Sequence, residues 1–138
     1  MQDVPLSISL ILRRIMSVGA DMTVTSVEPA GVDVRSYRDI ADRSLRLAAA
    51  LDTLGVPQGA TVASFAWNGH RHLELYYGVP VSGRVLHTIN VRLHDDVIEY
   101  VVAHARDRVV FVDASLTPNL ARLRDRLPVE TFVVMEDG

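Results

Sequence analysis

The sequence predicts an α/β fold in which a mostly parallel sheet carries helices on both faces. Segments with helical spacing of apolar residues alternate with short, almost continuously apolar runs. Strands and helices that alternate in this way form parallel sheets covered on both sides. At 138 residues the chain has the length of one domain. Four strands of this sheet are predicted, at 61–66, 84–89, 109–112 and 131–135.

A helix and a β-hairpin are predicted to precede the alternating part. The segment 5–20 ends at Gly19 and has helical spacing, with an apolar face made of Leu6, Leu10, Ile11 and Ile15. The runs 23–27 and 32–35 have the composition of strands. A Pro and a Gly lie between them, within 28–31, which is typical of a hairpin turn.

The remaining helices follow from capping and spacing. Ser36 and Asp39 have the spacing of a capping box, so we expect a helix from there to Gly55. Crossover units lie on both sides of the stretch 67–93, and we therefore expect this stretch to form the middle of the sheet. Three further helices are predicted, at 70–81, 94–105 and 118–127.

The composition excludes several classes of function. A net charge of −3 does not favour a nucleic-acid or anionic-membrane partner. The chain has no Cys, which excludes disulfides, thiolate nucleophiles and Cys-based metal sites. It also has no Lys, so a lysine nucleophile and a phosphate-loop lysine are both missing. The apolar run 4–11 is too short to span a membrane and lacks preceding basic residues, so we predict no transmembrane segment and a cytoplasmic location.

The glycines of 78–83 have the spacing of a phosphate-binding loop. Such a loop needs Lys and then Ser or Thr, whereas Arg84 and Val85 stand here. The glycines are also expected at the end of a helix rather than before one, so Gly83 is interpreted as a helix C-cap. The glycine-rich fingerprint of dinucleotide-binding folds does not occur in the chain.

His70 and His72 lie near the start of a predicted helix. Residues two apart on a helix point to different faces, so these two are poor ligands of one metal ion. His72 and Glu74 match half of a zinc-deaminase motif, whose other half requires Cys. We interpret both histidines as structural, either hydrogen-bonded or solvated.

The polar group best placed for a ligand follows the strand at 84–89. His87, Asn90 and Arg92 lie near its carboxyl end, where open α/β sheets bind ligands. Alternatively, Asn90 forms an Asx turn and Arg92 lies on the surface. Asp95 and Asp96 open the next helix, where acidic residues complement the helix dipole without any chemistry.

These residues do not form a recognisable catalytic site. No Ser has a sequence context for activation by His, and no nucleophile elbow is present. We therefore assign no catalytic, cofactor-binding or metal-ligating residue to this chain.

Two motifs carry a family resemblance: NGHRHLELYY at 68–77 and GRVLHTIN at 83–90. They resemble the amino-terminal part of fatty-acyl-CoA synthetases, which are adenylate-forming, AMP-binding enzymes. The similarity is collinear and clearest over 34–136. It implies that 1–138 is a partial N-terminal, AMP-binding domain. Two positions depart from the family pattern, because Val91 replaces a common Pro and Arg84 replaces a small residue.

The resemblance implies a ligase that joins a fatty acid to CoA through an acyl-adenylate, using ATP and Mg²⁺. In the family, the Lys-containing phosphate loop and a catalytic lysine lie further along the chain, so we expect these 138 residues to be inactive alone. A homodimer is also consistent with the family. The alternatives are a stand-alone binding or dimerisation module that kept the fold, and an unrelated flavodoxin-like domain with a small ligand at its strand ends.

Overall fold

The computed structural model describes residues 6–28 and 31–136. The centre of the molecule is a four-stranded parallel sheet. The strand order is β4-β3-β5-β6. All neighbouring strands in this sheet are parallel, as predicted. The strand ends differ from the predicted ones by at most one residue. The strands are β3 (Thr61–Phe65), β4 (Val85–Thr88), β5 (Val109–Asp113) and β6 (Thr131–Met135).

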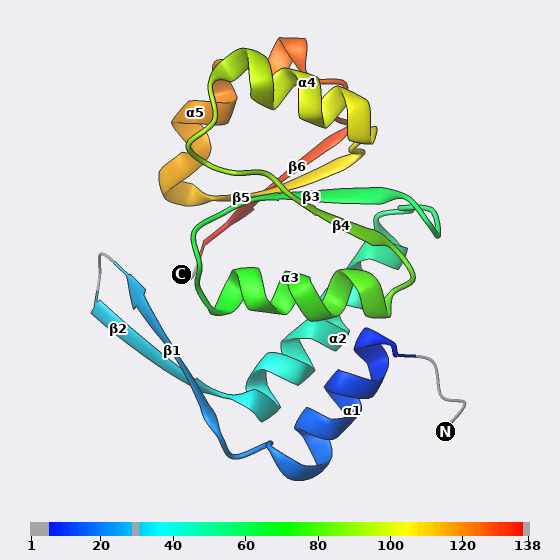
Figure 1. The fold of residues 1–138 in the computed structure, drawn as a ribbon, viewed down its shortest axis with the longest axis vertical. Helices are drawn as coiled ribbons and strands as arrows, with labels where there is room; N and C mark the ends of the chain where they lie inside the picture. The colour runs from blue at the N-terminus through cyan, green and yellow to red at the C-terminus, as the bar shows by residue number, and fades with distance from the viewer. Residues whose placement is uncertain (1–5, 29–30, 137–138) are drawn as a thin grey trace.

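Helices cover both faces of the sheet (Figure 1). α2 (Tyr37–Thr53) and α3 (His70–Val81) lie on one face, and α4 (Asp95–Ala105) and α5 (Thr117–Ala121) lie on the other. The predicted helix at 118–127 is wrong in its extent. It is replaced by α5 and two 3-10 turns, η1 (Ala114–Leu116) and η2 (Arg124–Arg126). The local leucines are all buried, and their spacing of three or four residues is compatible with 3-10 turns as well as with an α-helix.

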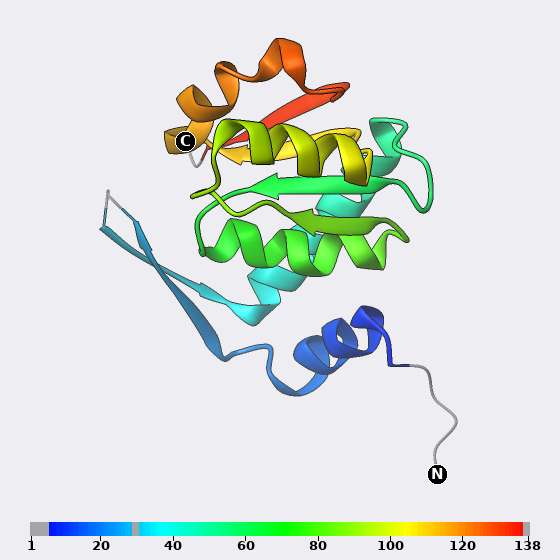
Figure 2. The same ribbon diagram turned by 45° about the horizontal axis from the view of Figure 1, so that its top comes forward.

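The N-terminal segment forms α1 (Ile8–Val18) and an antiparallel hairpin of β1 (Thr23–Glu28) and β2 (Gly31–Ser36), as predicted. Figure 2 shows the hairpin extending away from the body of the molecule. Pro5 and the turn residues 29–30 lie outside the described residues. Leu6 and Ile11 were expected on a buried face but are exposed. The reason is that α1 packs along Leu12, its buried residue, and begins only after Leu6.

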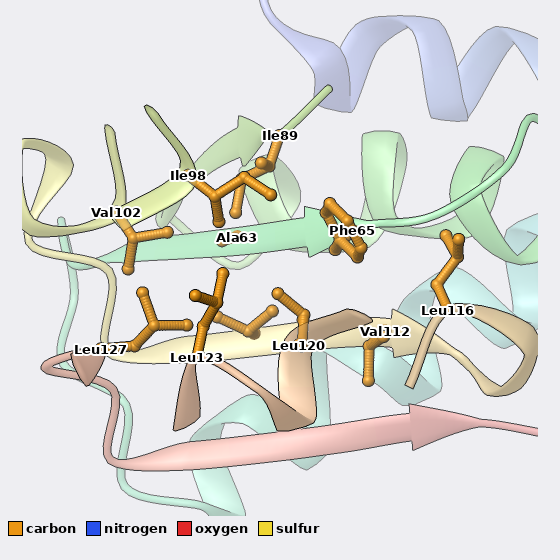
Figure 3. Packing of buried hydrophobic residues seen from close by; sticks show 11 residues of the cluster. Ala63, Phe65, Ile89, Ile98, Val102, Val112, Leu116, Leu120, Leu123 and Leu127 are labelled. Carbon is orange, nitrogen blue, oxygen red and sulfur yellow. The ribbon is translucent and has the colours of Figure 1, made fainter. Parts of the chain in front are cut away.

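Two apolar layers lie on either side of the sheet, because successive strand residues point to opposite faces. Ala63 packs toward α4 and α5, in the cluster shown in Figure 3. Its neighbour Val62 packs toward α2 and α3, together with Leu51, Leu75 and Val79.

Local signals determine where the helices begin and end. Ser36 and Asp39 form the predicted capping box at the start of α2. At the end of α3, Gly83 has φ = 75° and its amide bonds to Pro80 O at 3.0 Å, while the Arg84 amide bonds to Val79 O at 3.2 Å. This pair of bonds is a Schellman motif, so the interpretation of Gly83 as a C-cap is confirmed.

The prediction that the stretch 67–93 forms the middle of the sheet is wrong. Its strand, β4, lies at the edge of the described sheet. After β4 the chain passes back over β3 through α4 and places β5 on the far side of β3. The central strands are therefore β3 and β5.

A cleft at the carboxyl ends of β3 and β5

The strand order reverses direction between β3 and β5. The chain leaves β3 toward α3 on one face of the sheet, and it leaves β5 toward η1 and α5 on the other face. The two loops therefore diverge at the carboxyl ends of neighbouring strands. In open α/β sheets, ligands bind in the crevice at such a switch point.

A cleft of about 610 Å³ lies at this position. Trp67 and Asn68 contribute the loop after β3, and Asp113 and Ser115 contribute the end of β5 and the turn after it. The hairpin forms a further wall through Val27 and Glu28, and the end of β6 adds Met135 and Glu136. The volume falls within the usual range of pockets for small ligands.

Trp67 is held in the cleft by both of its N–H groups. Its backbone amide donates to Asp113 Oδ2 at 2.7 Å, and its indole Nε1 donates to Ser115 Oγ at 3.2 Å. The side chain nevertheless remains half exposed, at 49%. The indole is therefore fixed in orientation while part of its surface stays accessible.

Arg71 connects the hairpin to the sheet. Its guanidinium lies 3.0 Å from Glu28 Oε1 on β1 and 3.7 Å from Asp113 Oδ1 on β5. Next to it, the His70 amide donates to Ser26 Oγ at 2.8 Å. These contacts position the hairpin wall of the cleft against the N-terminus of α3.

His72 lies beneath the cleft and is 7% exposed. Its Nε2 is 2.9 Å from Ser64 Oγ on β3, and its ring packs against Tyr76. Burial lowers the pKa of His72, and the nearby Asp113 carboxylate and the Trp67 backbone oppose that effect only in part. At neutral pH His72 is therefore uncharged.

The two histidines of α3 have separate surroundings. The His70 ring is fully buried, with Nδ1 3.7 Å from Glu28 Oε1, whereas His72 contacts Ser64. Of the two sequence-based interpretations, solvation is wrong for both, and hydrogen bonding describes His72. Within residues 6–28 and 31–136, no group of three or more His, Cys, Asp or Glu residues is placed to hold a metal ion.

The structure does not bring His87, Asn90 and Arg92 together as one site. His87 Nδ1 lies 2.7 Å from Oδ2 of Asp107, which lies two residues before β5. Burial raises the pKa of Asp107, and the hydrogen bond from His87 opposes that shift. The Arg92 amide donates to Asn90 Oδ1 at 3.0 Å, and both side chains are exposed. The alternative of an Asx turn and a surface arginine describes these residues.

The glycines of 78–83 do not form a phosphate loop. Gly78 lies inside α3 and Gly83 follows the helix, whereas a phosphate loop precedes its helix. Gly78 instead allows α3 to approach α2, because a Cβ there would lie 2.7 Å from Ser44 O.

Arg84, one of the departures from the family pattern, is buried against the end of α2. Its Nε donates to Val56 O at 3.0 Å, and its guanidinium pairs with Asp52 at 2.8 Å. The large side chain is therefore accommodated by hydrogen bonds to the backbone and to a carboxylate.

The acidic pair at the start of α4 occupies the first helical turn, as expected. Asp95 additionally lies 3.4 Å from Arg122. In the part of the chain that the structure describes, no helix is long and apolar enough to cross a membrane.

Sequence reasoning did not identify Trp67, Asp113 and Ser115 as parts of one site. Each follows or ends a predicted strand, and that is the only local signal they carry. Recognising them as neighbours requires the knowledge that β3 and β5 are adjacent, which depends on the crossover through α4.

Comparisons with known proteins agree with this architecture. The 3-methylmercaptopropionyl-CoA ligase of Ruegeria pomeroyi is 39% identical over 133 residues, which cover 95% of this chain and 25% of that protein. The medium-chain-fatty-acid–CoA ligase of Ectopseudomonas oleovorans is 43% identical over 114 residues, which cover 81% and 21%. The chain thus spans about a quarter of the length of these curated relatives.

Solved structures have the same fold. An anthranilate CoA ligase in complex with anthranoyl-AMP superposes with a TM-score of 0.85 at 26% identity, covering 98% of this chain and 27% of that one. A fatty acyl CoA synthetase of Mycobacterium tuberculosis superposes with a TM-score of 0.82, covering 94% and 26%; at 24% identity this likeness concerns the fold alone. The family model of AMP-binding enzymes matches residues 17–138, and the chain therefore belongs to the AMP-binding enzyme family.

Proposed function

We propose that this chain is the amino-terminal part of an ATP-dependent acid–CoA ligase that activates a fatty acid. One observation carries the proposal: the 43% identity, over 114 residues, to a medium-chain-fatty-acid–CoA ligase. The reaction would convert fatty acid, ATP and CoA to acyl-CoA, AMP and pyrophosphate. ATP, Mg²⁺ and CoA would then be the cofactors and co-substrates of the complete enzyme.

The chain is proposed to contribute structure rather than catalytic groups. Adenylation develops negative charge on the phosphates, which enzymes stabilise with cations and positioned donors. The chain has no Lys. Arg71 already contacts Glu28 and Asp113, and Arg84 is buried against Asp52 and Val56. We therefore expect the 138 residues alone to release no pyrophosphate from ATP and a fatty acid.

A chimera tests the proposal. In the Ectopseudomonas oleovorans ligase, the 114 matched residues would be replaced by the corresponding residues of this chain. We expect the chimera to form acyl-CoA from medium-chain fatty acids, because the replaced segment supplies fold and contacts that the two sequences share. The relative with that segment deleted is the negative control. A folded chimera without ligase activity would contradict the proposal.

A stand-alone binding or dimerisation module is the second candidate. It is favoured by the outer face of the hairpin, where Val27, Val32 and Val34 lie on one side and are exposed. Analytical ultracentrifugation of the 138-residue chain tests it: a dimer that Val32→Glu dissociates would support the module. The cytoplasmic location stays a prediction, which cell fractionation can check.

A further inference from the structure

We propose that the cleft between the loops after β3 and β5 binds a small aromatic amine in its protonated form, with its ring against Trp67. This proposal does not depend on the ligase function. It assigns the cleft to a cationic ligand, separate from the phosphates and the carboxylate on which an acid–CoA ligase acts.

The first support is the fixed indole. Both N–H groups of Trp67 are used within the protein, on Asp113 and Ser115, yet half of the side chain is accessible. Because Ser115 already accepts the indole N–H, the exposed surface of Trp67 offers a ligand its π-system. Aromatic rings stack on such a surface, and cations are attracted to it by the ring quadrupole.

The second support is the charge of the lining. The carboxylates are those of Glu28, Asp113 and Glu136, and the guanidinium of Arg71 is the one formally positive side chain among the described lining residues. Arg71 already lies against Glu28 and Asp113. His72 adds no positive charge at neutral pH, because burial lowers its pKa. The cleft thus favours an ammonium group over a carboxylate or phosphate group.

The third support is position and size. The cleft lies where the strand order reverses, which is the usual ligand position of an open α/β sheet. Its volume of about 610 Å³ is ample for a single ring with a short aliphatic amine. Met135 adds a partly buried apolar side chain to the lining.

A pair of compounds with the same ring and opposite charge tests the proposal. Phenethylamine and 3-phenylpropionate would be titrated separately into ¹⁵N-labelled chain at pH 7. We expect phenethylamine to shift the amides of 67–71 and 113–115 and to bind at least about tenfold more tightly than 3-phenylpropionate. Equal or tighter binding of the carboxylate, no binding of the amine, or shifts confined to another surface would overturn the proposal.

Two variants locate the contact. Trp67→Leu should abolish the binding of phenethylamine, and Glu136→Gln, at an exposed lining position, should weaken it. Tyr100→Leu is the control, because this exposed aromatic residue lies on α4 and does not line the cleft. Unchanged binding in Trp67→Leu would overturn the proposal. If Trp67→Leu does not fold, the proposal is tested by Glu136→Gln and by the pair of compounds. Failure of the ligase chimera would leave these results unaffected.

Discussion

The backbone amide of Trp67 donates a 2.7 Å hydrogen bond to the carboxylate of Asp113, a residue 46 positions away in the sequence. The bond joins the loop that leaves β3 to the end of β5, at the point where the chain diverges to opposite faces of the sheet. It therefore fixes the geometry of the cleft. Arg71 adds a second, longer contact to the same carboxylate.

Asp113→Asn tests the importance of this bond for stability. The neutral amide accepts a weaker hydrogen bond from Trp67 and no longer pairs with Arg71, so we expect a loss of about 1–3 kcal/mol in the free energy of unfolding. Urea denaturation measures the loss. Trp67 is the sole tryptophan, so its fluorescence reports the same site. The exposed Asp125→Asn is the control, and an equal loss in both variants would contradict the role of Asp113.

Gly78→Ala tests the close approach of α2 and α3. A Cβ at this position would lie 2.7 Å from Ser44 O and 2.8 Å from Leu47 Cδ2, so the two helices must move apart. We expect a destabilisation of about 1–3 kcal/mol despite the higher helix propensity of Ala. Thermal unfolding followed by circular dichroism measures it. Gly19→Ala is the matched control, because its Cβ would meet only ordinary contacts at 3.7 Å or more.

Because His72 is buried, we expect the free energy of unfolding to decrease in mild acid. Burial lowers its pKa in the folded state below the ordinary value of 6.5, so the unfolded state binds more protons once the pH falls below about 6.5. The contribution of neutral His72 is fully present above that pH and decreases progressively as the pH falls toward the folded-state pKa.

The variant His72→Gln isolates this effect. Its free energy of unfolding, measured in urea from about pH 7.5 to pH 5, should depend less on pH than that of the parent chain. His94→Gln, which removes an exposed imidazole before α4, is the matched control variant. A slope that His72→Gln does not reduce would assign the acid sensitivity to other groups.

We expect the substitution Arg106→Gly to stabilise the protein. Arg106 follows α4 with φ = 57° and ψ = 45°, a left-handed conformation that strains a residue with a Cβ. Gly takes this conformation without that strain but loses more backbone entropy on folding, so we expect a net gain of up to about 1 kcal/mol. Arg46→Gly makes the same chemical change inside α2 and should cost about 1 kcal/mol. Chemical denaturation of both variants measures whether the two substitutions change the free energy of unfolding in opposite directions.

The elements that were predicted well are those with local signals. α3 spans His70–Val81 and β6 spans Thr131–Met135, both as predicted. The helical spacing lies within α3 and its stop signal, Gly83, lies two residues after its last residue, while β6 is an apolar run bounded by polar residues. The region 114–127 was predicted less well, because inward-facing leucines at spacings of three and four do not distinguish one α-helix from a series of short turns.

The candidate site was hardly predictable. His87, Asn90 and Arg92 follow one another along the chain, and their proximity in sequence suggested a site that the fold does not assemble. The burial of Arg84 was not predictable either. Its partners are Asp52 in the last turn of α2 and Val56 in the loop after that helix, and no local pattern indicates that the side chain is buried there.

The sequence by itself determined the kinds and bounds of most elements, the capping of α2, and the family to which the chain is similar, because periodicity, capping and motif identity are properties of neighbouring residues. Only the tertiary structure decided the strand order β4-β3-β5-β6, and with it the edge position of β4 and the cleft beside Trp67. The physical reason is that strand neighbours are chosen by the packing of crossover helices on the two faces of the sheet. That packing depends on contacts between residues far apart in the chain, such as Trp67 and Asp113.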